Sequence, residues 1–539
     1  MIFKKKIMKN YFNYVLVFII SFCTFGCTDD LNTEPLIELS LEELLDRDPD
    51  AVVGIVSRLY ASFALSGPDG PGSSDISDDA GESPFLRGII NLQDFTADAM
   101  KNRWGDDGLD QLTTTSDWTS NNKFFRYLYN RAYYTIPQCN NLLNVLTSVD
   151  VPNEEAVSAE VRFLRALAYY YVIDVFGKGV LVTENEVGIT TPLPEASRTE
   201  LFNYVESELL AIESVLPAKG DVSDYYGRAT NTAAQMLLAK LYLNAEVYTG
   251  TARYNDAAIF VNKVINEGGY MLASDFQMNF SADNDTSPEI IFPLIADAVI
   301  SQSYGNTTYI VNGSLSTETM NPNDFGATGG WTGHRATSAW YGLFCGGVSD
   351  SDGLRNCEDN RSQLFWIGTN PVTNDDLHTF EMLDYREWTN GYPSTKFRNT
   401  NFIGTSTSTE FSATDFPLFR LADAYLMYAE LAIRGATNTS MSDALNFVND
   451  VRTRSNASTI GAANLTLDFI IDERGRELNL EGMRRSDLIR FNKFTGGSYI
   501  WPWKGGTANG SSISDDYKLF PIPATALQAN PNLTQNPGY

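Results

Sequence analysis

The chain of 539 residues is 43% hydrophobic, and its 39 Lys and Arg against 67 Asp and Glu leave a formal net charge of -28. A chain of this length can bury a large core, in one large domain or in about two to four smaller ones. The negative charge repels polyanions, which argues against nucleic acid as a partner and disfavours sulfated or uronic polysaccharides. Neutral ligands suit such a surface better.

The N-terminus has a basic start followed by an apolar run from about Tyr11 to Phe25. The run is shorter than the roughly 20 residues of a spanning helix, so residues 1–26 are predicted to be an export signal. Thr24-Phe25-Gly26-Cys27 resembles a bacterial lipoprotein cleavage box and predicts lipidation of Cys27, with an uncleaved membrane anchor as the alternative. The acidic stretch after Cys27 resembles the signal that sends Bacteroidota-type lipoproteins to the outer face of the outer membrane.

The sequence contains only two histidines, His334 and His378, both in loop-like stretches. Ser-His-Asp triads, Cys-His dyads and most catalytic zinc sites need histidine, so these kinds of enzyme are disfavoured. Glycoside hydrolysis by two carboxylates needs no histidine and stays open at this point.

Three cysteines follow Cys27, namely Cys139, Cys345 and Cys357. Their odd number and the lack of a CxxC motif argue against a metal cluster. A disulfide between Cys345 and Cys357 and free buried thiols are both compatible with the sequence.

Helical periodicity dominates two blocks, at about residues 123–270 and 415–495, where Leu, Ala and Tyr recur at three- and four-residue steps. In each block an Ala-rich helix, a break and a second helix follow one another, which is typical of tetratricopeptide-like pairs that stack into a solenoid. Between the blocks, residues 274–414 are rich in Gly, Asn, Thr, Ser and aromatic residues. Loops this long are usually functional or disordered, and the aromatic residues argue against disorder.

A row of carboxylates stands near the C-terminus, in "IIDERGRELNLEGMRRSDLIRF", where Glu473, Glu477 and Glu481 are spaced by four residues. Such a row could hold the acid and base of a hydrolase, or it could brace the scaffold. Nearby acids have basic partners at helical spacing, which keeps a carboxylate pKa low and unsuited to general acid catalysis. The spacing therefore favours a structural role. The pairs predicted by spacing are Asp472 with Arg476, Glu481 with Arg485, and Asp487 with Arg490.

This pattern of Glu and Arg, continued by "YIWPWKGG" and the terminal "LFPIPATALQANPNLTQNPGY", resembles the C-terminal signature of the SusD/RagB family of surface glycan-binding lipoproteins. The stretches "GESPFLR", "GRATNTAAQMLLAKLYLNAEVYTG" and "DFPLFRLADAYLMYAE" extend the resemblance over nearly all of residues 27–539. The resemblance implies an all-α scaffold of four tetratricopeptide-like pairs, with a loop-rich ligand-binding region at about 66–118 and 274–414. It further implies a non-catalytic protein without a cofactor, and a SusC-like TonB-dependent outer-membrane transporter as partner.

Within the family, the motifs are closest to those of the starch-binding member, in which an arc of aromatic rings cups α-1,4-glucan. A sugar presents a flat CH face to an aromatic ring and hydroxyl groups to polar neighbours. By position within the motifs, the resemblance places the arc on Trp104, Tyr304 and Trp331, with hydrogen-bonding partners at Arg87 and Asp107.

Two positions depart from the starch-binding pattern. Asn102 stands where that pattern has another tryptophan, and Asp107 replaces an expected Asn, so a mixed donor and acceptor becomes an acceptor only. Fine specificity therefore stays open: another neutral glycan, a peptide bound in the RagB manner, or glycoside hydrolysis are the alternatives to starch.

An acidic run at residues 281–289 offers Asp283, Asn284 and Asp285 as ligands for a structural calcium ion. The run lacks the ordered alternation of an EF-hand loop, so a solvated turn is favoured.

Overall fold

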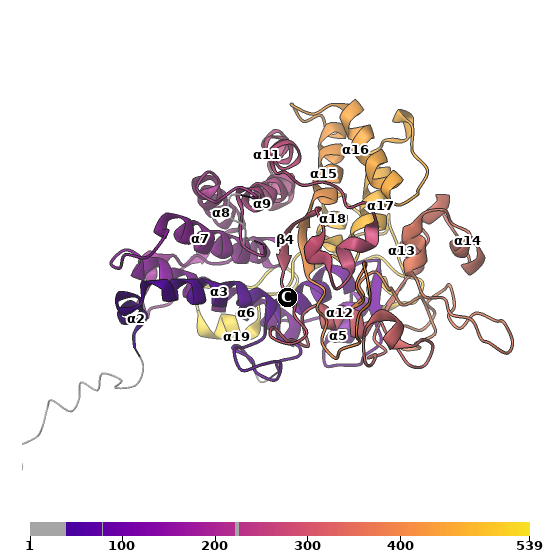
Figure 1. The fold of residues 1–539 in the computed structure, drawn as a ribbon, viewed down its shortest axis with the longest axis horizontal. Helices are drawn as coiled ribbons and strands as arrows, with labels where there is room; N and C mark the ends of the chain where they lie inside the picture. Colours follow the sequence, from indigo (N-terminus) through magenta and orange to yellow (C-terminus); the bar gives the residue numbers. More distant parts are fainter. Residues whose placement is uncertain (1–38, 78, 221–225) are drawn as a thin grey trace, which may run out of the picture.

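The computed structural model describes residues 39–77, 79–220 and 226–539, and the predicted export signal and Cys27 lie outside these ranges. The described chain is mainly helical, and its longer helices form a curved array that runs from α3 to α17 across Figure 1. The prediction of a helical fold class is thereby confirmed. No helix in the described ranges combines the length and the apolar character that crossing a membrane requires.

The scaffold consists of helices that pack in sequence order, α6 against α7, α7 against α8, α8 against α9, α9 against α11, α11 against α15, and α15 against α16. Such nearest-neighbour packing is the mark of a helical-repeat solenoid. Their bounds are α3 (Val52–Ala64), α6 (Lys123–Val145), α7 (Glu154–Tyr171), α8 (Arg198–Ile212), α9 (Asn231–Leu243), α11 (Tyr254–Glu267), α15 (Leu421–Ile433), α16 (Met441–Arg454), α17 (Leu467–Leu478) and α18 (Arg484–Arg490). Shorter helices at the edges are α2 (Leu41–Arg47), α10 (Ala245–Thr249) and α19 (Ala524–Ala529).

The pair α9 and α11 shows how the sequence determines where these helices begin, pack and end. The hydroxyl of Thr230 accepts a hydrogen bond from the Ala233 N–H and caps the start of α9. Ala257 and Ala258 of α11 are fully buried, and their small side chains let the two helices approach closely. The chain leaves α11 through Gly269, whose φ of +70° is the left-handed conformation that glycine adopts most readily.

Loops with short helices cover one side of the array and form the lower right of Figure 1. A disulfide joins Cys345 and Cys357 in this region, while Cys139 is a buried free thiol. The helices of this region are α4 (Phe85–Ile89), α5 (Leu109–Thr114), α12 (Thr307–Gly313), α13 (Ser338–Tyr341) and α14 (Ser351–Arg355).

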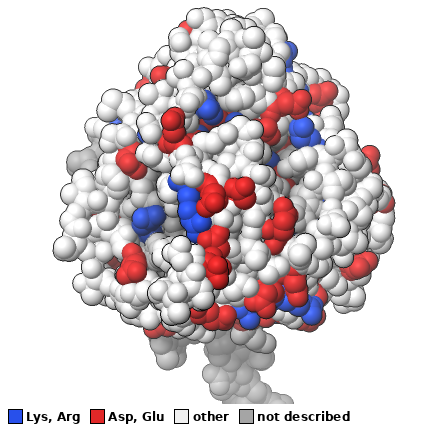
Figure 2. Space-filling view, turned by 90° about the vertical axis from the view of Figure 1, so that its right-hand side faces the viewer, with Lys and Arg blue, Asp and Glu red and all other residues white. Residues whose placement is uncertain are grey.

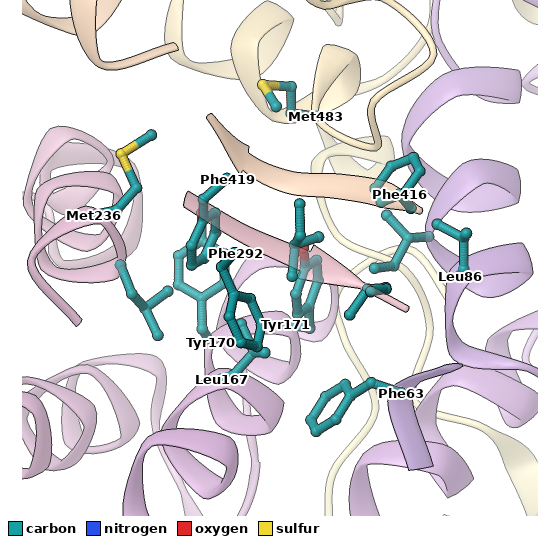
Figure 3. Close-up of a cluster of buried hydrophobic side chains, with 14 of the residues drawn as sticks. Phe63, Leu86, Leu167, Tyr170, Tyr171, Met236, Phe292, Phe416, Phe419 and Met483 are labelled. Atoms are coloured by element: carbon teal, nitrogen blue, oxygen red, sulfur yellow. The ribbon is translucent and has the colours of Figure 1, made fainter. Parts of the chain in front are cut away.

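Short antiparallel strand pairs connect the loops to the scaffold. In the middle of the molecule β4 (Ile290–Leu294) pairs with β6 (Phe416–Arg420), and Phe292 lies opposite Phe419. Figure 3 shows these two rings among side chains from the surrounding helices, including Tyr171 of α7 and Phe63 of α3. Burying each large apolar side chain contributes about 1.5–3 kcal/mol, so this cluster holds the loop region firmly on the helices.

Two other strand pairs are shorter. β1 (Met100–Asn102) pairs with β5 (His334–Ala336), which brings together loop segments more than 200 residues apart in sequence. β2 (Gly179–Val180) pairs with β3 (Glu195–Ala196) at the edge of the helices.

A buried network of ion pairs ties α17 to the end of β6. Arg420 Nη1 is 2.8 Å from Glu289 Oε1 and 2.7 Å from Glu477 Oε1, and Arg420 Nε is 2.7 Å from Glu481 Oε2. All four side chains are at most 1% exposed. Because each charge is surrounded by opposite charge, the row of glutamates braces the scaffold, as its spacing suggested.

The first glutamate of the row is held in the same way. Glu473 forms ion pairs with Arg361 at 2.9 Å, with Arg452 at 2.6 Å and with Arg476 at 2.8 Å. Burial by itself would raise the pKa of Glu473, but the positive charges of Arg476, Arg361 and Arg452 outweigh it and lower the pKa to about 2. The carboxylate is therefore ionised at neutral pH and cannot donate a proton.

One of the three ion pairs predicted from spacing is confirmed, because Arg490 Nη2 lies 2.8 Å from Asp487 Oδ1. The pair of Asp472 with Arg476 is wrong, since Arg476 turns to Glu473 three residues before it.

The predicted pair of Glu481 with Arg485 is also wrong, because α17 ends at Leu478 before it reaches Glu481. Leu480 and Gly482 both have positive φ, so a turn breaks the helical register here. The turn aims Glu481 at Arg420 instead, and Arg485 donates to the backbone carbonyl of Tyr517.

Replacing Glu477 by Gln should destabilise the fold strongly, because it leaves buried arginines without their counter-charge. Removing one partner of a buried ion pair typically costs about 3–5 kcal/mol. Asp468→Asn on the same helix is the matched control, since Asp468 pairs with Lys493 at an 85% exposed position and should change stability by less than about 0.5 kcal/mol. Urea unfolding followed by circular dichroism measures both, and equal stabilities would contradict the bracing role.

Acid should weaken the fold through the same network. The pKa of Glu473 is lowered from 4.5 to about 2, so its stabilisation is complete above about pH 4.5 and is lost as the pH falls toward 2. We expect the urea midpoint to decrease across this window, and to decrease less steeply in Glu473→Gln. Identical slopes in the two proteins would show that this carboxylate does not carry the acid sensitivity.

Candidate functional site

Three aromatic rings from distant parts of the chain meet beside the β1–β5 pair. The ring centroids of Trp104 and Trp331 are 6.4 Å apart with 48° between their planes, and those of Tyr304 and Trp331 are 6.3 Å apart with 49° between their planes. All three side chains are half-buried, so part of each ring is open to solvent. We call these three rings the aromatic platform.

The loop backbone sets the position of Trp104. Its N–H donates to Asn102 Oδ1 at 2.6 Å, and its indole Nε1–H donates to the Trp331 carbonyl at 3.1 Å. Gly333 lies directly beneath the ring, where an added Cβ would come within 2.6 Å of Trp104 Cζ2. Trp104 therefore stacks on a position that accepts glycine only.

The other two rings are held by polar contacts from separate loops. The Trp331 N–H donates to the Asn312 carbonyl at 2.7 Å, and the Asn312 side chain donates to the Glu410 carbonyl. The Tyr304 hydroxyl donates to Glu410 Oε1 at 3.2 Å, and the Tyr304 ring lies 4.9 Å from Phe411. Desolvation and this hydrogen bond both raise the pKa of Tyr304, so the phenol remains neutral.

His334 supports the platform from below. Its ring lies 5.3 Å from Trp104, and Nε2 donates to the Tyr309 carbonyl at 2.9 Å, so Nδ1 accepts from the Asn102 amide at 2.8 Å. Burial lowers the pKa of His334 to about 3, which keeps the ring neutral. His334 lies in β5 and not in a loop as the sequence indicated, and Asn102 is fully buried.

Arg87 lies under the platform. Its guanidinium carbon is 4.4 Å from the Tyr309 ring centroid and 5.8 Å from that of Trp104, and the residue is 7% exposed. Its Nη1 donates to the Gly81 carbonyl, and its Nη2 is 3.8 Å from Asp106 Oδ2. In this position Arg87 supports Trp104 by a cation–π contact, and one edge of its guanidinium group is directed at Asp106.

Asp107 follows Asp106 in the sequence and is more exposed. Its side chain is exposed, and within the described part of the chain its carboxylate has no hydrogen-bond or ion-pair partner. The structure thus brings all five predicted binding residues to one area, with Arg87 buried beneath the rings and Asp107 at the surface.

Several residues of this area were not predicted from the sequence. Tyr309, on α12, is fully buried between Arg87 and His334, and Glu410 holds Tyr304 from a loop rich in Ser and Thr. A tyrosine in an apolar helix and one acid in a polar loop have no local signal, because their roles depend on tertiary partners, such as Arg87 for Tyr309 and Tyr304 for Glu410.

The acidic run considered for calcium has other partners. Asp283 accepts hydrogen bonds from the Phe402 and Ile403 N–H groups, and the Asn284 side chain bonds to the backbone of Asn279 and Asp415. These contacts use both side chains to fix loops. Among the described residues there is no cluster of three or more acidic, histidine or cysteine side chains suited to a metal ion.

Comparison with known proteins identifies the family. Residues 87–243 match a family described as starch-binding and associating with the outer membrane, and residues 375–539 match the SusD family. The sequence is 32% identical to the starch-binding protein SusD of Bacteroides thetaiotaomicron, over 99% of this chain and 100% of that protein. The chain belongs to the SusD family.

Solved structures agree with this assignment at the level of the fold. Surface glycan-binding protein A of Bacteroides fluxus matches with a TM-score of 0.69 and 19% identity, over 91% of this chain and 99% of its own. Surface glycan-binding protein A of Bacteroides thetaiotaomicron, in complex with laminarihexaose, matches with a TM-score of 0.67 and 22% identity, over 90% and 99% of the two chains. SusD of Bacteroides thetaiotaomicron and these two solved proteins are named as binding proteins and not as enzymes.

Gly333→Ala should displace the Trp104 ring, because the new methyl group would overlap it. Forcing an extra methyl group into a packed site typically costs about 1–3 kcal/mol, which the ring can relieve by moving outward. Gly329→Ala in the same loop is the control, since nothing lies within 4 Å of its added Cβ. ¹⁹F NMR of protein labelled with 5-fluorotryptophan should show a shifted Trp104 resonance in the first variant alone, and an unshifted resonance there would contradict the packing.

Proposed function

We propose that this SusD-family chain is a non-catalytic lipoprotein of the cell surface that binds a neutral polysaccharide on its aromatic platform. The preferred ligand is starch-like α-1,4-glucan or its maltooligosaccharides. Asp107 provides an exposed polar group beside the rings of Trp104, Tyr304 and Trp331, and Arg87 provides a guanidinium group beneath them.

The observation that carries the proposal is the tilt between neighbouring rings. Successive planes of the platform are inclined by 48° and 49°, so the three rings do not form a flat surface. A helical polysaccharide turns its sugar faces progressively, and a curved row of rings can stack on several of them at once. A single ring, or three coplanar rings, would discriminate less between glycans of different shape.

Charge around the platform agrees with a neutral ligand. The acids Asp106, Asp107, Glu318 and Glu410 stand near the rings, and Arg103 pairs with Glu318 at 3.5 Å. Figure 2 shows a face of the molecule on which acidic groups are scattered among large uncharged areas, without a broad basic patch. A polyanionic glycan would meet repulsion here.

The relatives support the same ligand class. The family member 32% identical to this chain is named as starch-binding, and a structure of the same fold holds laminarihexaose. We extend glycan binding to this chain on that basis, and starch on the resemblance of the platform motifs.

Attachment and partner complete the proposal. A lipid on Cys27 would hold the protein on the outer face of the outer membrane, where it would deliver oligosaccharide to a SusC-like TonB-dependent transporter. No catalytic group and no cofactor are needed for this task.

Trp331→Ala and Trp104→Ala should each abolish retention of the protein in an amylopectin affinity gel. Removing a central ring of a binding surface commonly costs 2 kcal/mol or more, which is about thirtyfold in affinity. Phe402→Ala serves as the control, because Phe402 is an aromatic residue in a different loop and, at 41%, is more exposed than the half-buried Trp104 and Trp331.

The same gel without glycan and the urea midpoint of each variant show whether the fold is intact. Unchanged retention of folded Trp331→Ala and Trp104→Ala proteins would refute the platform as the site. Release of reducing sugar from soluble starch by the wild-type protein would instead indicate a hydrolase.

A further inference from the structure

A cavity of about 720 Å³ lies apart from the aromatic platform, between α17, the end of α16 and the segments joined by the Cys345–Cys357 disulfide. Its volume is within the roughly 300–1,000 Å³ of small-molecule sites. Its lining, taken from the described residues, includes none of the platform rings. We call it the α17 cavity.

One face of α17 forms the floor of this cavity. Phe469, Asp472 and Arg476 follow one another at steps of three and four residues, so they share a face of the helix. Glu473 and Glu477 lie on the adjoining face of the helix, where both form ion pairs of the buried network. The charged stretch that braces the scaffold therefore also presents a second set of side chains to the cavity.

Two guanidinium groups are fixed at this floor. Arg452 Nη1 and Arg476 Nε both donate to Glu473 Oε2, at 2.6 and 2.8 Å. Arg452 Nε also donates to the Ser458 carbonyl, and Arg476 Nη1 to the Leu343 carbonyl, each at 2.7 Å. Within the described part of the chain the Nη2 atom of each arginine has no hydrogen-bond partner, and neither atom is sealed from solvent. Two hydrogen-bond donors are thus held in place for a ligand.

Acceptors and an aromatic surface complete the lining. Asp472 is half-buried, and no ion pair or hydrogen bond occupies its carboxylate among the described residues. At the rim, Glu358 is exposed, and Asn356 donates to the Asp352 carbonyl, while its own Oδ1 accepts no hydrogen bond from the described residues. The Phe469 ring lies 5.5 Å from the Arg452 guanidinium carbon.

The charges of the lining select among ligand classes. The positive charges of Arg452 and Arg476 face the negative charges of Asp472 and Glu358, with Glu473 directly behind them. An anionic ligand would meet more negative than positive charge, and a cationic ligand would meet the two guanidinium groups at the floor. A neutral ligand with many hydroxyl groups can use the donors and the acceptors together.

We infer that the α17 cavity is a second binding site for a neutral oligosaccharide, with hydroxyl groups bound by Arg452, Arg476 and Asp472 and one sugar face against Phe469. The inference shares its ligand class with the proposed function but uses none of its residues. The disulfide joins the cavity wall at residues 345–347 to the segment that carries Asn356 and Glu358, so it restrains the separation of these two walls.

Equilibrium dialysis of the full mature protein with maltotriose, cellotriose or laminaritriose tests this inference. Four proteins are compared: wild type, the platform variant Trp104→Ala/Trp331→Ala, the cavity variant Phe469→Ala/Asp472→Ala, and the combination of both. We expect two classes of site in the wild type for at least one sugar, one class in each double variant, and at least a tenfold weaker affinity in the combination.

A further variant guards against misfolding, because Phe469 packs against the core. Asn356→Ala/Glu358→Ala changes only exposed rim residues, and in the platform background it should lower the remaining affinity several-fold.

The possible results separate the two proposals. If the platform variant loses all binding, the second site is refuted and the proposed function stands. If the platform variant binds like the wild type and the cavity variants do not, the second site stands and the platform assignment is refuted. If the wild type binds none of the three sugars, or if no cavity variant weakens binding in the platform background, the inference is overturned.

Discussion

The contact of Arg420 with Glu477 and Glu481 is the constraint on which the rest of the structure depends. It joins a strand in the centre of the molecule to the last long helix of the repeat array and to the turn after it, and all three side chains are at most 1% exposed. A buried charge is costly when a partner is missing, so this contact favours the arrangement of strand and helix that keeps all partners in place. Because β6 also pairs with β4, that arrangement determines where the loop region begins and ends on the helices.

The aromatic platform follows from a different kind of constraint. Its rings are positioned mainly by backbone groups: a carbonyl holds the Trp104 indole, another carbonyl holds the Trp331 N–H, and a glycine leaves room beneath Trp104. Side chains on loops are usually mobile, but these loops are crosslinked by hydrogen bonds at the level of the main chain. The rings therefore form a surface whose shape exists before a ligand arrives, which reduces the ordering cost of binding.

Local patterns in the sequence were enough to predict the helical class. Three- and four-residue periodicity and a glycine that ends a helix, such as Gly269, depend only on residues of that helix. The grouping of Trp104, Tyr304 and Trp331 was predicted from the resemblance of motifs and not from any local rule. The partners of the charged row were predicted less well. Spacing suggested contacts within one helix, yet the turn at Leu480 redirected Glu481 to Arg420, some 60 residues earlier in the chain. Tyr309 and Glu410 were missed for the same reason, since a tertiary contact decides what each of them does.

The strand pair β1–β5 joins residues 100–102 to residues 334–336, and Tyr304 depends on Glu410 still further along. Contacts of such long sequence separation form slowly, because a large loop must close before any of them is gained. A chain that is synthesised from its N-terminus can build the first helix pairs early, but it cannot complete the aromatic platform until more than three quarters of it has been made, because Tyr304 contacts Glu410. The platform is thus a property of the finished fold, and a product that ends before Glu410 would keep helices while lacking the contact that holds Tyr304.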